Sequence, residues 1–249
     1  MCEYCGLCQR GCPHHLIYSS TNTLHILLKH ENFQYLNNII VDNFEESENN
    51  MRIYATHRLS KEKRIFFATQ VFCGCGSIIS TILFLRSTKQ WNQKISFLDT
   101  THFMFPCIMK TKADDVLHEK LHTLCQLFLK LKVSSEMNHA VTLQLYTYMD
   151  YYLQEIKQKF KILFPIVSPF VKPFLNRLVV IQGFLNSDHS HQFDLSITES
   201  GSAHLSAKTY SEVAPQIQRI LLLMKEAQQQ LGMRPVQPLL KTSAIGKSF

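Results

Sequence analysis

The residues most capable of chemistry are cysteines near the start of the chain. Cys2, Cys5, Cys8 and Cys12 form a Cys-x-x-Cys-x-x-Cys-x-x-x-Cys run that is followed by Pro13. Thiolates at this spacing hold iron–sulfur clusters in other proteins. Such a cluster also needs a strand before its first cysteine and a cysteine from a second run, and the sequence offers neither. An iron–sulfur cluster is therefore one alternative rather than the expected state.

Zinc is a second alternative, because thiolate and imidazole ligands at short spacing are typical of zinc sites. Its ligands would be Cys2, Cys5, Cys12 and one of the pair His14 and His15. The third interpretation is a group of cysteines that holds no metal. This is the one that we expect, so the sequence predicts no cofactor.

The other cysteines are expected to be structural. Cys73 and Cys75 flank Gly74 in a predicted tight turn between strands, where such a pair packs more often than it binds metal. Cys107 and Cys125 lie among apolar neighbours and are expected in the core.

Glycine-dependent catalytic motifs are missing from the chain. Only eight glycines occur, and the single Gly-x-Gly is Gly74-Cys75-Gly76, so neither a phosphate-binding P-loop nor a dinucleotide fingerprint is present. The nucleophile motif Gly-x-Ser-x-Gly is also missing. We therefore expect a protein that is not an enzyme.

The composition predicts a folded protein with a basic surface. Of its 249 residues, 45% are apolar and 18% are charged, and the formal net charge is +7. A basic excess suits nucleic acid or an acidic partner. No run of about 18 apolar residues lacks a charge, and the chain does not open on a basic and then apolar segment. We expect no membrane association, and a nuclear or cytoplasmic location with reduced cysteines.

The first half of the chain predicts strands followed by one helix. Segments 52–55, 64–72, 77–85 and 94–98 are rich in β-branched and aromatic residues, as strands are. Segment 114–132 predicts a helix, because leucines and a phenylalanine recur every three or four residues. These residues are Leu117, Leu121, Leu124, Phe128 and Leu131.

The second half predicts strands between two further helices. The expected strands are 139–147, 177–185, 192–197 and 203–207, with 177–185 and 192–197 paired as a hairpin. The first helix, 150–164, is expected to stop at the prolines 165, 169 and 173. The second follows a Thr209-x-x-Glu212 capping box, runs through 211–231 and ends at Gly232.

Together these elements predict the fold class α/β (α+β), with a mixed or mostly antiparallel sheet and long helices on one face. Residues 1–50 are expected to form a cysteine-rich segment and an acidic linker. Residues 51–232 are expected to form the α/β domain, and residues 233–249 a flexible tail.

The end of the predicted domain contains the most informative spacing in the chain. Lys208 follows a predicted strand, and seven residues later Pro215-x-Ile217 opens the last helix. This arrangement resembles the end of the transducer domain in topoisomerase VI B subunits. The resemblance implies that the fold is transducer-like and that Lys208 corresponds to the lysine that senses a nucleotide phosphate.

The resemblance also implies a function. Because the sequence lacks the glycine-rich ATP-binding motifs of B subunits, it is most similar to the meiotic B-like subunit. That protein partners a topoisomerase VI A-like subunit, which cuts DNA in meiotic double-strand break formation and recombination. Leu222 and Leu223 lie off the predicted core stripe of the last helix and are the expected partner-binding residues. The alternatives are an unrelated intracellular adaptor domain, or a zinc or iron–sulfur protein built on the first cysteines.

Overall fold

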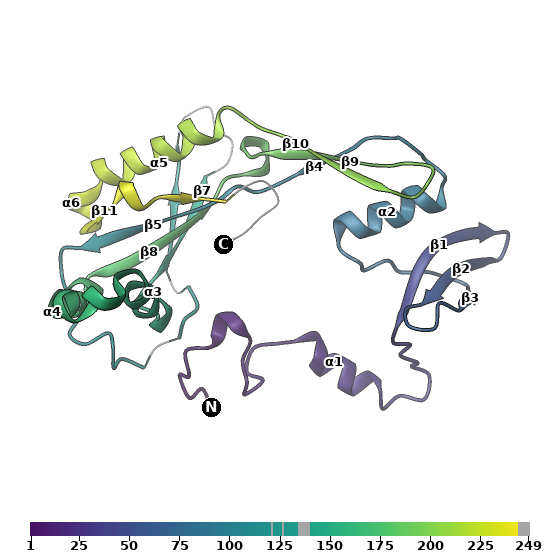
Figure 1. Cartoon of the computed structure of the whole chain (residues 1–249), viewed down its shortest axis with the longest axis horizontal. Coiled ribbons are helices and arrows are strands. Elements are labelled where there is room, and N and C mark those ends of the chain that lie inside the picture. Colours follow the sequence, from purple (N-terminus) through teal and green to yellow (C-terminus); the bar gives the residue numbers. More distant parts are fainter. Residues whose placement is uncertain (121, 126, 134–139, 244–249) are drawn as a thin grey trace. The chain divides into compact units, whose positions relative to one another are not determined.

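The computed structural model describes residues 1–120, 122–125, 127–133 and 140–243 of the chain. It has an α+β fold, as predicted, and it divides into two compact units (Figure 1). Unit 1 comprises residues 1–19, 98–191 and 209–249, and unit 2 comprises residues 20–97 and 192–208. The chain therefore enters each unit more than once, whereas the sequence predicted boundaries near residues 50 and 232. Among the described residues, none of the helices is both long enough and apolar enough to cross a bilayer.

Unit 1 is built on one six-stranded sheet. Its strands follow the order β11-β5-β8-β7-β6, and β12 also pairs with β5. Every strand pair of this sheet with a described register is antiparallel. The strands are β5 (His102–Met109), β6 (Leu127–Leu131), β7 (Val141–Tyr146), β8 (Leu178–Phe184), β11 (Met233–Pro235) and β12 (Lys241–Thr242).

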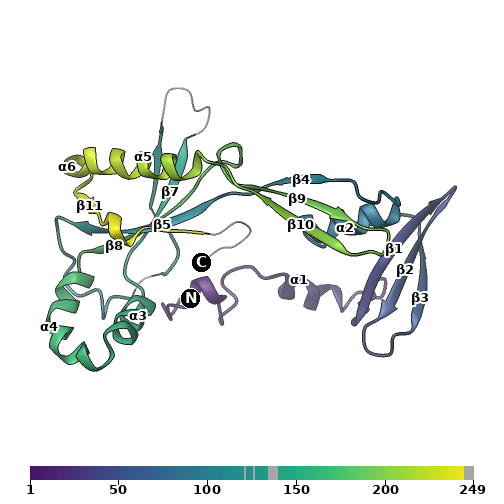
Figure 2. The ribbon, with the colours of Figure 1, turned by 45° about the horizontal axis from the view of Figure 1, so that its top comes forward.

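Helices cover both faces of this sheet, which differs from the single covered face that the sequence predicted. Alternation along the central strand β8 explains the difference, because successive side chains point to opposite faces. Val179 and Ile181 pack in the cluster that contains helix α5 (Val213–Glu226). Leu178 and Val180 pack in a second cluster with helix α4 (Phe164–Leu175). Helix α5 and helix α4 accordingly lie on opposite sides of the sheet in Figure 2.

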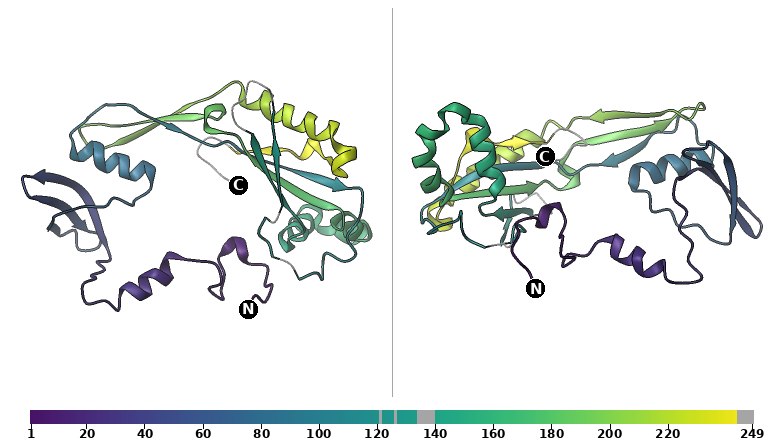
Figure 3. Two further views of the ribbon diagram at one scale, coloured as in Figure 1. Left: turned by 180° about the vertical axis from the view of Figure 1, so that it is seen from behind. Right: turned by 60° about the horizontal axis from the view of Figure 1, so that its bottom comes forward.

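The other α-helices described in unit 1, α3 and α6, adjoin α4 and α5 in the chain. Helix α3 (Asp150–Phe160) leads through the 3-10 turn η2 (Lys161–Leu163) into α4, and α6 (Gln228–Leu231) follows α5. Two green helices, α3 and α4, lie together in Figure 3. Three further 3-10 turns are η1 (Cys8–Arg10), η3 (Ser187–His189) and η4 (Gln237–Leu239).

Unit 2 contains two three-stranded sheets and two helices. One sheet has the order β1-β2-β3 and the other the order β10-β9-β4. Helix α2 contacts both β1 and β9. The elements are α1 (Ser20–Leu27), β1 (Ile39–Ser47), β2 (Asn50–His57), β3 (Lys63–Ala68), α2 (Ser77–Ser87), β4 (Ile95–Leu98), β9 (Gln192–Ile197) and β10 (Ala203–Lys208).

Two predictions of element type are wrong. Segment 77–85 lies in helix α2 rather than in a strand. Its β-branched and aromatic residues favour a strand, but Ile78, Ile82 and Leu85 are also spaced four and three residues apart, as on one face of a helix. Segment 114–132 is not the predicted helix: a turn covers 116–118 and strand β6 covers Leu127–Leu131. In β6 the leucines 127, 129 and 131 recur every two residues, which is the period of a strand. Leu121 of the predicted stripe lies outside the described residues.

The predicted proline stop is also wrong. Pro165 lies in the first turn of α4, where a missing N–H costs nothing, and Pro169 and Pro173 lie inside the helix. The Ser168 hydroxyl donates to the Pro165 carbonyl at 2.9 Å, which satisfies an acceptor that Pro169 cannot. The helical path breaks earlier, at Lys161, whose φ is 41°.

The predicted strands 177–185, 192–197 and 203–207 are confirmed as β8, β9 and β10, and 139–147 as β7, although His139 lies outside the described residues. The pairing of 177–185 with 192–197 is wrong. Strand β8 pairs with β5 and β7, and β9 pairs with β10 and β4. Although β8 and β9 follow one another in the chain, their partners are set by the whole sheet and not by the turn residues between them.

The last predicted helix is confirmed as α5 and α6, and Gly232 ends it in the left-handed conformation with φ 63°. Its start differs, because Glu212 is the N-cap and no side chain caps it. Residues that we expected in a flexible tail contribute β11 and β12, both paired with β5. Residues 244–249 lie outside the described part.

Candidate protein-binding surface and the predicted sites

A group of exposed apolar side chains in unit 1 lies on η2 and α4. We call it the α4 surface and define it as Ile162, Leu163, Ile166, Phe170 and Phe174. Ile162 is 92% exposed, Phe170 is 75% exposed and Ile166 is 71% exposed. Ile166, Phe170 and Phe174 are spaced four residues apart, so they form one ridge of roughly 12 Å along the helix.

The opposite face of α4 explains why this ridge stays outside. Val171 and Leu175 are buried in the cluster below the sheet, and Val167 packs against it. Helix α4 is therefore apolar on two faces, and only one of them packs in the core of unit 1. The exposed prolines 165, 169 and 173 lie one residue before each ridge position and widen the apolar face.

Lysines border the α4 surface at the α3 end. Lys157 Nζ lies 5.7 Å from the ring centroid of Phe164. Lys159 and Lys161 are exposed, and neither forms an ion pair within the described ranges of the chain. Lys172 differs, because its ammonium lies 3.2 Å from Asp115 Oδ2. The combination of an apolar ridge and unpaired cations fits an apolar partner segment with acidic flanks.

The predicted partner-binding leucines lie on α5. Leu222 is 44% exposed, whereas Leu223 is half-buried. Their neighbours Leu221 and Met224 are buried against the sheet of unit 1. Leu222 is thus the accessible member of the pair, and it projects from a helix that the core holds in place.

Lys208 ends strand β10 and has a partner within unit 2. Its ammonium lies 2.9 Å from Asp194 Oδ2 on the neighbouring strand β9. Ser96 on β4 donates to the other Asp194 oxygen at 2.6 Å, so the three residues join three strands. The Ser96 hydroxyl and then the Lys208 ammonium lower the pKa of the buried Asp194 carboxyl. A phosphate at Lys208 would have to compete with this carboxylate.

The first cysteines are not part of a group of three or more potential metal ligands in the described residues. Cys2, Cys5, Cys8 and Cys12 are free thiols, and nowhere in the described ranges do three or more His, Cys, Asp or Glu side chains form a group able to hold a metal ion. Hydrogen bonds from the backbone, led by that of Leu16, lower the pKa of the Cys12 thiol. His14 instead lies 3.5 Å from Glu3.

One metal-binding motif in the sequence was not among the predicted sites. His118, Glu119 and His122 form a His-Glu-x-x-His sequence, which on a helix places two histidines on one face as zinc ligands. Here His118 lies in a turn, and its Nδ1 is 2.9 Å from Asp115. His122 Nδ1 instead lies 4.0 Å from Cys2 Sγ. The two imidazoles have different partners, so this geometry does not make one metal site.

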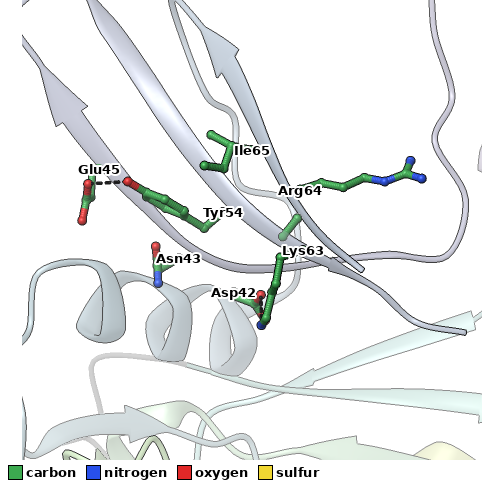
Figure 4. Close-up of a pocket in the computed structure, with 8 residues that line it drawn as sticks. Asp42, Asn43, Glu45, Tyr54, Lys63, Arg64 and Ile65 are labelled. Carbon is green, nitrogen blue, oxygen red and sulfur yellow. Dashed lines mark hydrogen bonds and ion pairs between the residues drawn. The ribbon is translucent and has the colours of Figure 1, made fainter. Parts of the chain in front are cut away.

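A hollow in unit 2 has a volume of about 470 Å³ and is lined by residues of β1, β2 and β3. Figure 4 shows two interactions among its side chains, Lys63 with Asp42 and Tyr54 with Glu45, while Arg64 points away from them. Tyr54 donates to Glu45 at 2.9 Å, and Lys63 lies 3.4 Å from Asp42. Asn43 Oδ1 accepts no hydrogen bond from the described residues. This arrangement of paired side chains indicates a structural role.

Comparisons with known proteins add no name to these features. No model of a known protein family matches the chain. No curated protein matches it either.

The α4 surface is the feature that the sequence analysis missed, although the largely apolar segment from Phe160 to Phe174 was a usable signal.

Proposed function

We propose that this protein is a non-catalytic subunit that binds a second protein through the α4 surface. We propose further that the partner is a DNA-cleaving subunit similar to the A subunit of topoisomerase VI. The exposure of the α4 surface supports the first statement, and the spacing of Lys208, Pro215 and Ile217 supports the second. The protein would then act in the nucleus, in meiotic double-strand break formation, and would meet DNA through its partner.

The physical case for binding is the cost of leaving this ridge in water. Burying apolar surface is favourable by about 25 cal/mol per Å². Contiguous apolar patches on folded proteins commonly mark interaction sites, and aromatic residues dominate the centres of interfaces. A straight ridge with four-residue spacing packs well between the ridges of another helix. The unpaired Lys159 and Lys161 favour a partner helix with acidic residues beside its apolar stripe.

Helix α5 supplies a second proposed contact. Leu222 is exposed, and the buried Leu221 and Met224 beside it hold the helix on the sheet. The order of a strand ending in Lys208 and a helix with Pro215 in its first turn is the order on which the resemblance rests. We therefore retain Leu222 and Leu223 as proposed partner-binding residues.

The test is co-purification of this protein with a topoisomerase VI A-like meiotic subunit from the same source. Replacing Ile166 and Phe170 by glutamate should weaken the complex by on the order of tenfold or more, because both are central and exposed. Leu222→Glu should weaken it if α5 also contributes. Phe67→Glu is the matched control, since Phe67 is also an exposed aromatic residue, at 69%.

Each outcome separates the alternatives. Loss of the complex in the Ile166/Phe170 variant, with Phe67→Glu unchanged, would support both statements. Failure of the wild-type protein to bind an A-like subunit, with the chain folded by circular dichroism, would rule out the named partner. An adaptor role would then remain if an acidic amphipathic peptide still bound wild-type protein but not the double variant. Unchanged binding in that variant would rule out the α4 surface.

A further inference from the structure

Two cysteines in unit 2 form a pair that the sequence analysis expected to pack rather than to bind metal. Cys73 and Cys75 lie in the loop between β3 and α2, and both are exposed. Their sulfur atoms are 3.9 Å apart. A disulfide bond is about 2 Å long, so the two sulfurs need to approach by roughly a further 2 Å. An added Cβ at Gly74, the residue between them, would meet nothing within 4 Å, so the loop is open on that side.

The surroundings of the two thiols differ. Cys73 Sγ lies 3.3 Å from the Ser80 hydroxyl in the first turns of α2. This hydroxyl stabilises the thiolate and lowers the pKa of Cys73, whereas the neighbouring Cys73 sulfur raises the pKa of Cys75. Gly76 is the N-cap of α2 and offers no side-chain cap, so the positive end of this eleven-residue helix faces the loop.

We propose that Cys73 and Cys75 are a site of thiol–disulfide exchange, whose substrate is an accessible disulfide of a peptide or small molecule. Cys73 is the nucleophile and Cys75 is the resolving thiol. This assignment is independent of the proposed function, since it uses a different surface and a different chemistry.

The exchange balances without a metal or another cofactor. The Cys73 thiolate attacks one sulfur of the substrate R–S–S–R, which forms a mixed disulfide and releases one R–S⁻. The Cys75 thiolate then attacks Cys73 Sγ, which forms the Cys73–Cys75 disulfide and releases the second R–S⁻. The two protons lost by the cysteines pass through water to the two leaving thiolates. The protein pair is oxidised by two electrons, and the substrate is reduced to two thiols.

The test exposes the reduced full-length protein to glutathione disulfide, followed by alkylation, trypsin digestion and mass spectrometry. No Lys or Arg lies between Arg64 and Arg86, so one tryptic peptide carries both cysteines. In wild-type protein this peptide should lose two hydrogens. The Cys75→Ser variant should instead stop at a glutathione adduct on Cys73. The Ser80→Ala variant removes the hydroxyl beside Cys73 Sγ and should therefore react several-fold more slowly. Helix α2 should persist in this variant, because alanine is a better helix former than serine.

Cys5 and Cys107 are the internal controls, because Cys5 is exposed and unpaired with another thiol whereas Cys107 is buried. The proposal is overturned if Cys73 reacts no faster than Cys5, or if wild-type protein and Cys75→Ser accumulate the same adduct. A second arm replaces glutathione disulfide by a peptide disulfide with aromatic residues, because Phe72 next to Cys73 is 91% exposed. Faster reaction with the peptide would assign a protein source of substrate, and equal or slower reaction a small-molecule source.

Discussion

At the scale of single residues, the same residue type takes opposite roles in different surroundings. Burial alone raises the pKa of the Cys107 thiol to about 12, so this cysteine is an inert core residue. Cys73 is exposed, and a hydroxyl beside it lowers its pKa. Lys208 is bound to a buried carboxylate, whereas Lys159 has no ion-pair partner in the described ranges. Spacing in sequence does not distinguish these cases, because the deciding neighbours come from other elements.

The Lys208–Asp194–Ser96 group predicts a pH-dependent contribution to stability. The pKa of Asp194 is lower in the folded chain than in the unfolded chain, so its stabilisation is present above the unfolded pKa of about 4. It is lost as the pH falls through the folded value. The Asp194→Asn variant should therefore be less stable than wild type at neutral pH, and should lose less stability than wild type in acid. Urea unfolding followed by circular dichroism measures this.

Two lysine variants calibrate that measurement. Lys208→Ala should cost only about 0.5 kcal/mol, because half of the lysine side chain is exposed to water. Lys63→Ala removes the more exposed Asp42 pair and should be close to neutral. An Asp194→Asn variant with the same acid sensitivity as wild type would contradict the assignment.

At the scale of elements, close packing around β8 fixes the sheet of unit 1. Gly183 lies between Phe103 on β5 and Leu143 on β7 in the strand register. A Cβ at Gly183 would lie 2.3 Å from Phe103 Cζ and 2.8 Å from Leu143 Cδ2. Both side chains are completely buried. The glycine is therefore required because a phenyl ring occupies the space where its side chain would lie.

Gly183→Ala is accordingly predicted to destabilise unit 1 by about 1–3 kcal/mol through overpacking. Thermal unfolding of this variant should show a lowered midpoint. Gly74→Ala is the matched control, because a Cβ there meets nothing within 4 Å, and it should change the midpoint little. The double variant Gly183→Ala/Phe103→Leu should recover part of the loss. No recovery, or an equal loss in the control, would show that packing against Phe103 is not the cause.

At the scale of the whole molecule, the buried apolar clusters are concentrated in one unit. Both clusters of the described residues, one with α5 and one with α4, belong to unit 1. In unit 2, strand β10 forms the edge of its sheet, and all six of its residues are exposed. Local stability follows buried contacts, so the two units should open with different free energies.

Hydrogen exchange followed by mass spectrometry checks this expectation. Peptides from β8 should exchange most slowly, because β8 pairs on both sides and is buried on both faces. Peptides from β10 should exchange orders of magnitude faster. Peptides covering β11 should be protected as well, since this strand pairs with β5 and Met233 is buried. Fast exchange in β11 would instead agree with the flexible tail that the sequence predicted.

The sequence by itself determined the α+β class, the strands β8, β9 and β10, and helix α5 with its end at Gly232. These features depend on local residue preferences, on the apolar period and on a glycine that can adopt a positive φ. Only the tertiary structure decided that 77–85 is a helix, that Leu127–Leu131 is a strand and that β9 pairs away from β8. It also decided which face of α4 is exposed and which partner Lys208 has. The physical reason is that partners distant in the chain supply the burial and hydrogen bonds, and the local pattern fits more than one of them.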